Sequence, residues 1–233
     1  MECIFQRYET KYLVTRKQGA ALRDVFLRYM EPDRYGAYLV QNLYYDTEGW
    51  DVIRASVDKP FYKEKLRLRC YGPHGTDLFL ELKKKFDGIV YKRRIALPES
   101  ASVRDAVAAN PAQIARELEF YLKANDVSEK IYLAYNRTAI TGEQGLRVTF
   151  DTDIRFRTDR LDFKPPYEGI PILPGDRMLI EIKTLGGAPI WMARALSEHH
   201  VYPTPFSKVG TCYINYILGR PAPSEKRLVE LSA

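Results

Sequence analysis

The stretch YKEKLRLRCY, residues 62–71, alternates charged or polar side chains with apolar ones. Successive side chains of a β-strand point to opposite faces, so this alternation predicts a strand with one apolar and one charged face. The leucines and the cysteine share the apolar face. The other face carries only cations: Lys63, Lys65, Arg67 and Arg69. The stretch therefore predicts a half-buried strand whose open face is strongly basic.

The same alternation recurs along the chain and predicts further strands over residues 4–14, 38–45, 77–85, 89–97, 130–141, 146–156 and 178–184. Helical spacing of apolar residues is confined to shorter segments, namely residues 15–29, a turn or two after residue 47, and residues 102–109, 112–124, 189–199 and 211–218. Strands thus outnumber helices, and antiparallel pairing is expected. The pattern predicts an α+β fold that is mainly antiparallel, with roughly the strand number of a small closed barrel.

The chain has 233 residues, of which 45% are hydrophobic and 28% charged, and it contains no repeat or Gly/Ser linker. We expect a single domain over residues 1–233, with residues 220–233 as a possible peripheral tail. Three widely spaced cysteines give no disulfide framework, so a reducing cytoplasm is the expected location. We expect neither a secretion signal nor a membrane segment. The net charge of +6 favours anionic partners without choosing among them.

Cations repeat on one face of several predicted strands, as Lys83 and Lys85 do, and then Lys92 and Arg94. One such face can be a solvated outer surface, and that alternative stays open for each strand alone. However, an ordinary solvated face mixes both signs with neutral polar residues. Neighbouring cations repel one another unless the face surrounds a polyanion, so the repetition favours a polyanion-binding surface.

Three carboxylates lie on these basic faces: Glu9, Glu81 and Glu181. Carboxylates among phosphate-binding cations are suited to a hard divalent ion, which bridges to phosphate oxygens. The alternative for each is a cross-strand ion pair with a neighbouring cation. The sequence has no glycine-rich phosphate loop, and its histidines, His74, His199 and His200, offer no catalytic pairing. Any phosphate must therefore be held by side chains.

Eight blocks in order resemble the VTC (vacuolar transporter chaperone) domain, the polyphosphate polymerase branch of the triphosphate tunnel metalloenzyme superfamily. They lie between residues 7 and 216: RYETKYLV (7–14), NLYYDT (42–47), KEKLRLRCYG (63–72), LELKKKFDGIVYKRR (80–94), YNRTA (135–139), LRVTFDTDIRF (146–156), LIEIKT (179–184) and FSKVGTCY (206–213). The resemblance implies a closed eight-stranded-type tunnel barrel with a basic lumen and flanking helices. It also implies an enzyme that transfers the terminal phosphoryl group of a nucleoside triphosphate, expected to be ATP, to a growing polyphosphate chain.

The resemblance implies a set of catalytic cations: Lys11, Arg67, Arg69, Lys83, Arg137, Arg147 and Lys208. Further candidates for binding phosphate are Lys65, Lys85, Lys92, Arg94, Lys183 and Ser207. Glu181 is the implied ligand of a Mn²⁺ or Mg²⁺ cofactor, and Glu9 is a second, weaker candidate. Hydrolases of the superfamily typically open with two alternating glutamates before the lysine, whereas this chain has only Glu9 before Lys11, which implies a thinner metal site.

Two other functions remain open. A triphosphatase or tripolyphosphate hydrolase on the same barrel would use water as the acceptor, and it would need a base to orient that water. A polyphosphate- or RNA-binding module without activity would be expected to expose aromatic side chains for stacking. The 17 tyrosines keep this reading open, but many fall on apolar faces, so no nucleic acid partner is expected. The oligomeric state is left undetermined.

Overall fold

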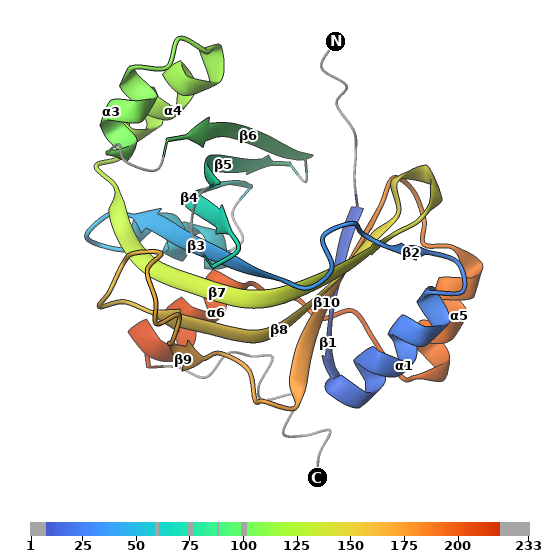
Figure 1. Cartoon of the computed structure of the whole chain (residues 1–233). Helices are drawn as coiled ribbons and strands as arrows, with labels where there is room; N and C mark the ends of the chain where they lie inside the picture. The colour runs from blue at the N-terminus through green and yellow to red at the C-terminus, as the bar shows by residue number, and fades with distance from the viewer. Residues whose placement is uncertain (1–7, 59–60, 74–76, 88, 99–101, 220–233) are drawn as a thin grey trace. The chain divides into compact units, whose positions relative to one another are not determined.

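The computed structural model describes residues 8–58, 61–73, 77–87, 89–98 and 102–219. Its strands are β1 (Tyr8–Thr15), β2 (Glu31–Pro32), β3 (Tyr38–Asp46), β4 (Tyr62–Tyr71), β5 (Leu78–Phe86), β6 (Ile89–Leu97), β7 (Ser128–Thr141), β8 (Arg147–Arg157), β9 (Ile170–Pro171) and β10 (Arg177–Thr184). Its helices are α1 (Arg16–Phe26), α2 (Asp51–Val57), α3 (Val103–Ala108), α4 (Gln113–Ala124), η1 (Glu143–Gly145), α5 (Ile190–Glu198), α6 (Lys208–Cys212) and η2 (Tyr213–Ile217). The predicted α+β class with dominant antiparallel strands is confirmed (Figure 1).

Hydrogen bonds connect the main strands in the order β1-β10-β8-β7-β3-β4-β5-β6, with β2 pairing with β7 and β9 with β8. The pairs β1 with β10, β10 with β8, β2 with β7, β3 with β4, β4 with β5 and β5 with β6 are antiparallel. The order has two ends, β1 and β6, and no pairing joins them within the part of the chain that the structure describes. The predicted closed barrel is therefore not confirmed.

The chain divides into two compact units. Unit 1 comprises residues 1–38, 135–154 and 171–233, and unit 2 comprises residues 39–134 and 155–170. Strands β7 and β8 contribute residues to both units. The division does not test the prediction of one domain, which stays a prediction. The possible peripheral tail, residues 220–233, and His74 lie outside the described residues.

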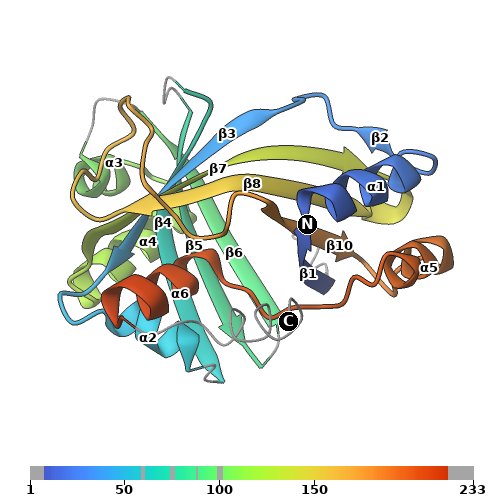
Figure 2. The ribbon, with the colours of Figure 1, turned by 90° about the horizontal axis from the view of Figure 1, so that it is seen from below.

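In unit 1, helices α1 and α5 cover the apolar face of strands β1, β10 and β8, and both views show α1 next to β1 (Figures 1 and 2). Helix α1 begins after Thr15, whose hydroxyl accepts a hydrogen bond from Gln18 N at 3.1 Å, while Gln18 Oε1 accepts one from Thr15 N at 3.0 Å. This capping box fixes the start that the sequence predicted. At Gly19 a Cβ atom would clash with Met178 Sδ of β10, so a larger residue here would force the Met178 side chain to move.

In unit 2, helices α3 and α4 supply residues such as Val107, Leu118 and Leu122 to a core with the apolar face of β4, β5 and β6. That face is built by Leu66, Leu68, Leu80, Leu82, Ile95 and Leu97, all of which are at most 8% exposed. The alternation of apolar and charged residues along the strands therefore produces one packed and one charged face in both units, as predicted. In each unit, one face of the sheet is packed against helices, and the charged residues lie on the other face.

Candidate phosphate-binding site

The charged face of unit 1 is set by strand register. Glu9 of β1 lies opposite Lys183 of β10, and Lys11 lies opposite Glu181. On its other side, Glu181 lies opposite Thr149 of β8. The neighbours along these strands, among them Ile180 and Ile182, are buried in the core, so alternation brings the charged residues together on one face.

Four cations surround the Glu181 carboxylate among the described residues. Lys208 Nζ lies 2.9 Å and Lys11 Nζ 3.8 Å from Oε1, while Lys183 Nζ lies 3.4 Å and the Arg137 guanidinium 3.6 Å from Oε2. Glu181 is only 6% exposed. Burial alone would raise the pKa of its carboxyl, but Lys208, Lys183, Lys11 and Arg137 outweigh burial and hold that pKa well below the ordinary value. Glu181 is therefore ionised at neutral pH.

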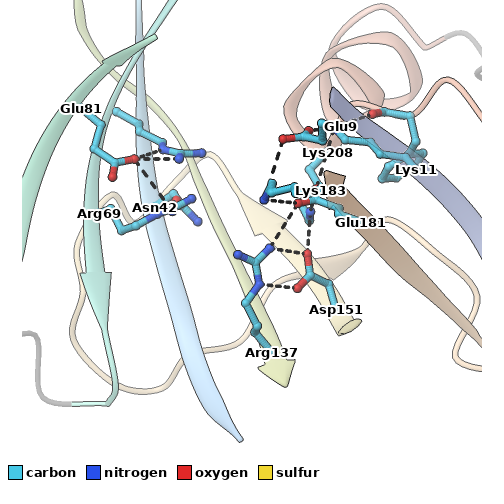
Figure 3. Close-up of polar contacts among 12 residues, drawn as sticks. Glu9, Lys11, Asn42, Arg69, Glu81, Arg137, Asp151, Glu181, Lys183 and Lys208 are labelled. Carbon is cyan, nitrogen blue, oxygen red and sulfur yellow. Dashed lines mark hydrogen bonds and ion pairs between the residues drawn. The ribbon is translucent and has the colours of Figure 1, made fainter. Parts of the chain in front are cut away.

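A second carboxylate, Asp151, lies fully buried beside Glu181 (Figure 3). Arg137 donates from Nε to Oδ1 at 2.6 Å and from its terminal nitrogen to Oδ2 at 2.7 Å, and Lys208 Nζ lies 2.7 Å from Oδ2. Burial would raise the pKa of Asp151, yet Lys208 and Arg137 lower it. Burial would likewise lower the pKa of Lys208, yet Asp151 and Glu181 raise it. These four groups form a buried network of fixed charges.

Asp151 was not among the predicted site residues, although strand alternation puts it on the same face of β8 as Arg147. Tyr135 was also not selected, and its ring lies 4.8 Å from Lys208 Nζ and 5.0 Å from the Arg137 guanidinium carbon. The signal that could have found Asp151 is that it shares a strand face with Arg147, Thr149 and Asp153. In the sequence alone, a single carboxylate in such a position cannot be told from a solvated surface residue. Its partner Lys208 approaches it only in the folded protein.

The remaining predicted residues of unit 1 lie around this network. Lys11 Nζ donates to the Phe206 carbonyl at 3.0 Å and lies 3.5 Å from Glu9 Oε1. Glu9 Oε2 lies 3.8 Å from Lys183 Nζ. Arg147 donates to Asp33 Oδ2 at 3.0 Å. Ser207, predicted to bind phosphate, precedes α6, where its hydroxyl accepts a hydrogen bond from Gly210 N at 3.2 Å and starts the helix that carries Lys208.

Unit 2 carries a separate cluster on the charged face of β4, β5 and β6, centred on Glu81 (Figure 3). Arg67 donates from Nε at 2.8 Å and from a terminal nitrogen at 2.7 Å to Glu81 Oε2. Lys92 Nζ lies 2.6 Å and Arg94 Nε 3.7 Å from Oε1, and Arg69 lies 3.8 Å from Oε2. The ion-pair alternative that the sequence left open for Glu81 is thus confirmed.

The unit 2 cluster has an excess of positive charge. Burial would raise the pKa of Glu81, but the cations, led by Arg67, hold it at about 2. The pKa of Lys92 is lowered by burial together with Arg67 and Arg69, despite the opposing effect of Glu81. One carboxylate therefore does not neutralise its neighbours, and an added anion would stabilise the cluster.

Further lysines lie directly opposite one another in the same sheet. Lys65 pairs in register with Lys83, and Lys83 with Lys92, while Lys63 pairs with Lys85. Like charges in directly opposed positions of a sheet destabilise it. The register thus brings together the cations that the sequence placed on shared faces, and it strengthens the case that unit 2 binds an anion. Arg69 is oriented by Asn42, whose Oδ1 accepts from its Nε at 2.9 Å.

Unit 1 offers few side-chain ligands for a divalent cation. No group of three or more acidic, histidine or cysteine side chains that could hold a metal occurs in the ranges that the structure covers. Magnesium and manganese, however, often take only one or two carboxylates, with water and substrate phosphate completing the shell. Glu181 and Glu9, on paired strands, supply the one or two carboxylates that an ion of that kind requires.

The described helices include none that is long and apolar enough to cross a membrane.

A comparison with curated proteins found no match. Among solved structures, the PH1819 protein of Pyrococcus horikoshii matches with a TM-score of 0.51 at 16% identity, over 91% of this chain and 98% of that one. A protein from Vibrio parahaemolyticus described as a "putative adenylate cyclase" matches with a TM-score of 0.50 at 13% identity, over 88% of this chain and 96% of that one. At these identities the likeness concerns the fold alone.

In both units, the open face of the antiparallel sheet carries a buried carboxylate surrounded by several cations. The model of the VTC domain family matches residues 6–215, which is most of the chain. The chain therefore belongs to the VTC domain family.

Proposed function

We propose that this protein is a metal-dependent polyphosphate polymerase, which transfers the terminal phosphoryl group of ATP to a growing polyphosphate chain in a basic tunnel of the family's kind. Membership of the VTC domain family supports the class of enzyme. The proposal that phosphate, and not water, is the acceptor rests on the lowered pKa values of the buried carboxylates. The pKa values of Glu81, Asp151 and Glu181 are all lowered by neighbouring cations.

A carboxylate with a lowered pKa is a poor general base, because a base works best when its pKa lies near the operating pH. Hydrolysis requires a group that orients and deprotonates water. A terminal phosphate acceptor is already anionic and requires no such base, so these carboxylates favour transfer to phosphate over transfer to water. Phosphoryl transfer relies mainly on positioning and on electrostatic stabilisation, and cations supply both.

In unit 1 we assign the binding of phosphate to Lys11, Arg137, Arg147 and Lys208, with Lys183 and Ser207 beside them. The Arg137 guanidinium is held by Asp151 through Nε and one terminal nitrogen, so its orientation is fixed before any ligand binds. Glu181, with Glu9 as the second ligand, would hold Mn²⁺ or Mg²⁺, which neutralises charge on the phosphate oxygens when bound.

In unit 2 we assign the binding of phosphate to the cations on and around Glu81: Arg67, Arg69, Lys83, Lys65, Lys85, Lys92 and Arg94. Arginines make forked contacts to phosphate oxygens, whereas lysines act as point charges. Polyphosphate carries negative charge along its whole length, so it matches a row of opposed lysines better than a single small anion does. We also propose a reducing, cytoplasmic location, consistent with the buried free thiols of Cys70 and Cys212.

The test is a quantitative analysis of products after incubation with ATP and Mn²⁺. A polymerase releases ADP while the transferred phosphate is retained in polyphosphate chains, so ADP should greatly exceed orthophosphate. A hydrolase releases ADP and orthophosphate in equal amounts. No turnover with several nucleotides and metals would leave a binding protein without activity.

A further inference from the structure

Thr149 of β8 has a buried hydroxyl with no hydrogen-bond partner among the residues that the structure describes. The residue is fully buried, with an exposed fraction of 0%. A buried polar group without a partner destabilises the fold, and most buried polar groups in native proteins are paired. A threonine retained in such a position therefore calls for a physical explanation, because valine would fill the same space without the unpaired group.

The Thr149 side chain lies on the charged face of unit 1. Its neighbours Val148 and Phe150 belong to the apolar core, so alternation places Thr149 on the face that carries Arg147 and Asp151. Across the sheet, Thr149 is the register partner of Glu181. The hydroxyl thus lies beside the network of Glu181, Asp151, Arg137 and Lys208.

The acceptors nearest along these strands already have donors of their own. Both oxygens of Asp151 accept from Arg137, and Lys208 approaches one of them. Glu181 Oε1 accepts from Lys208 at 2.9 Å. An ammonium or guanidinium group is a stronger donor to a carboxylate than a hydroxyl is, so the cations hold these oxygens and leave the hydroxyl proton for another acceptor.

We infer that Thr149 is a phosphate-binding residue whose hydroxyl donates a hydrogen bond to a phosphoryl oxygen of a triphosphate or polyphosphate bound on the charged face of unit 1. The cations of this face draw in an anion. The hydroxyl is covered in the ligand-free protein, so the side chains over it must move as the anion binds, and the anion then supplies the acceptor that the hydroxyl lacks. The nature of the ligand rests on the proposed function. The position of the hydroxyl and its lack of a partner are independent of the proposed function.

Two substitutions separate the hydroxyl from the shape of the side chain. Thr149→Val keeps the branched shape and removes the hydroxyl, whereas Thr149→Ser keeps the hydroxyl. Thr152→Val is a matched control, because Thr152 lies on the same strand with its side chain on the opposite face. The probe is inorganic tripolyphosphate in the presence of Mg²⁺, titrated by calorimetry into each protein, with the melting temperature of each ligand-free protein measured in parallel.

Thr149→Val should bind tripolyphosphate about tenfold more weakly or worse, as expected for the loss of a hydrogen bond to a charged group. Thr149→Ser should stay within a few-fold of the wild type, and Thr152→Val should match it. The ligand-free melting temperature of Thr149→Val should equal or exceed that of the wild type, since the variant loses only an unpaired polar group. A residue that mattered only for stability would show the opposite, a lower melting temperature with unchanged affinity.

Unchanged affinity in Thr149→Val, with normal binding by the wild type, overturns this inference and leaves the proposed function intact. An equal loss in Thr149→Ser also overturns it, because packing would then be the cause. Mn²⁺ titrated alone gives a further check: weaker Mn²⁺ binding by Thr149→Val would assign the hydroxyl to the metal shell instead. Failure of the wild type itself to bind tripolyphosphate would overturn the proposed function, and the inference with it.

Discussion

Arg137 holds both carboxylate oxygens of Asp151, with Nε 2.6 Å from Oδ1 and a terminal nitrogen 2.7 Å from Oδ2. Both residues are buried. The pairing fixes the plane of the guanidinium group, and the other terminal nitrogen points away from Asp151. Asp151 therefore acts as a positioning residue for a cation that we assign to phosphate binding.

Asp151→Asn should destabilise the protein by about 3–5 kcal/mol, because it leaves Arg137 and Lys208 buried without their shared carboxylate. Asp153→Asn is the matched control on the same strand. Asp153 pairs with Arg16 at 2.6 Å, but both side chains are 47% exposed, so its loss should amount to at most about 1 kcal/mol. Urea unfolding at pH 7 measures both values. Equal losses in the two variants would contradict a structural role for the buried pair.

Glu81 should make the stability of the protein depend on pH in acid. Its folded pKa of about 2 lies below the ordinary value of 4.5. A depressed folded pKa gives a contribution that is fully present above the unfolded pKa and is lost as the pH falls from about 4.5 towards 2. The contribution is about 3 kcal/mol. Unfolding measured across this range should show a shallower pH dependence in Glu81→Gln than in the wild type, and parallel curves would count against the assignment.

Glu181→Gln should abolish turnover while ATP still binds, because the amide keeps the shape of the side chain and removes the charge that would hold the metal. Glu143→Gln is the control, since Glu143 is exposed in η1 of the same unit. Activity and nucleotide affinity should both be measured with Mn²⁺. Full activity in Glu181→Gln would exclude the metal assignment.

Arg67→Lys should weaken tripolyphosphate binding by about tenfold, although the charge is retained. The Arg67 guanidinium contacts Glu81 through two nitrogens and Tyr44 through the third, and an ammonium group cannot reproduce this geometry. Arg93→Lys is the control, because Arg93 belongs to the other face of β6, where it pairs with Glu117. The two variants should differ clearly in a calorimetric titration, and equal affinities would argue against a fixed role for Arg67.

The strands could be predicted from the sequence because each has one packed and one charged face, and this alternation is a local property. Helix ends were less predictable. The helix expected over residues 15–29 ends at Phe26, since Tyr29 leaves the helical pattern to stack on Trp191 at 4.3 Å. The helix expected over residues 211–218 begins at Lys208, because Ser207 caps it. Closure of the barrel, by contrast, depends on how distant strands meet, which alternation does not encode.

The residues of the candidate site were predicted as sets of same-face cations, and strand register brings many of them together within each unit. Asp151 was missed because its partner Lys208 is distant in sequence, and no local pattern indicates that the two will meet. Thr149 was given no role, since a buried hydroxyl without a partner is visible only once the packing around it is known.

The most direct test of the proposed function is gel electrophoresis, stained for polyphosphate, of the purified protein after incubation with ATP and Mn²⁺. A polymerase predicts a ladder of chains that lengthen with time in the wild type and are absent in Glu181→Gln. Release of orthophosphate with no ladder in the wild type would contradict the account and would assign the protein as a hydrolase.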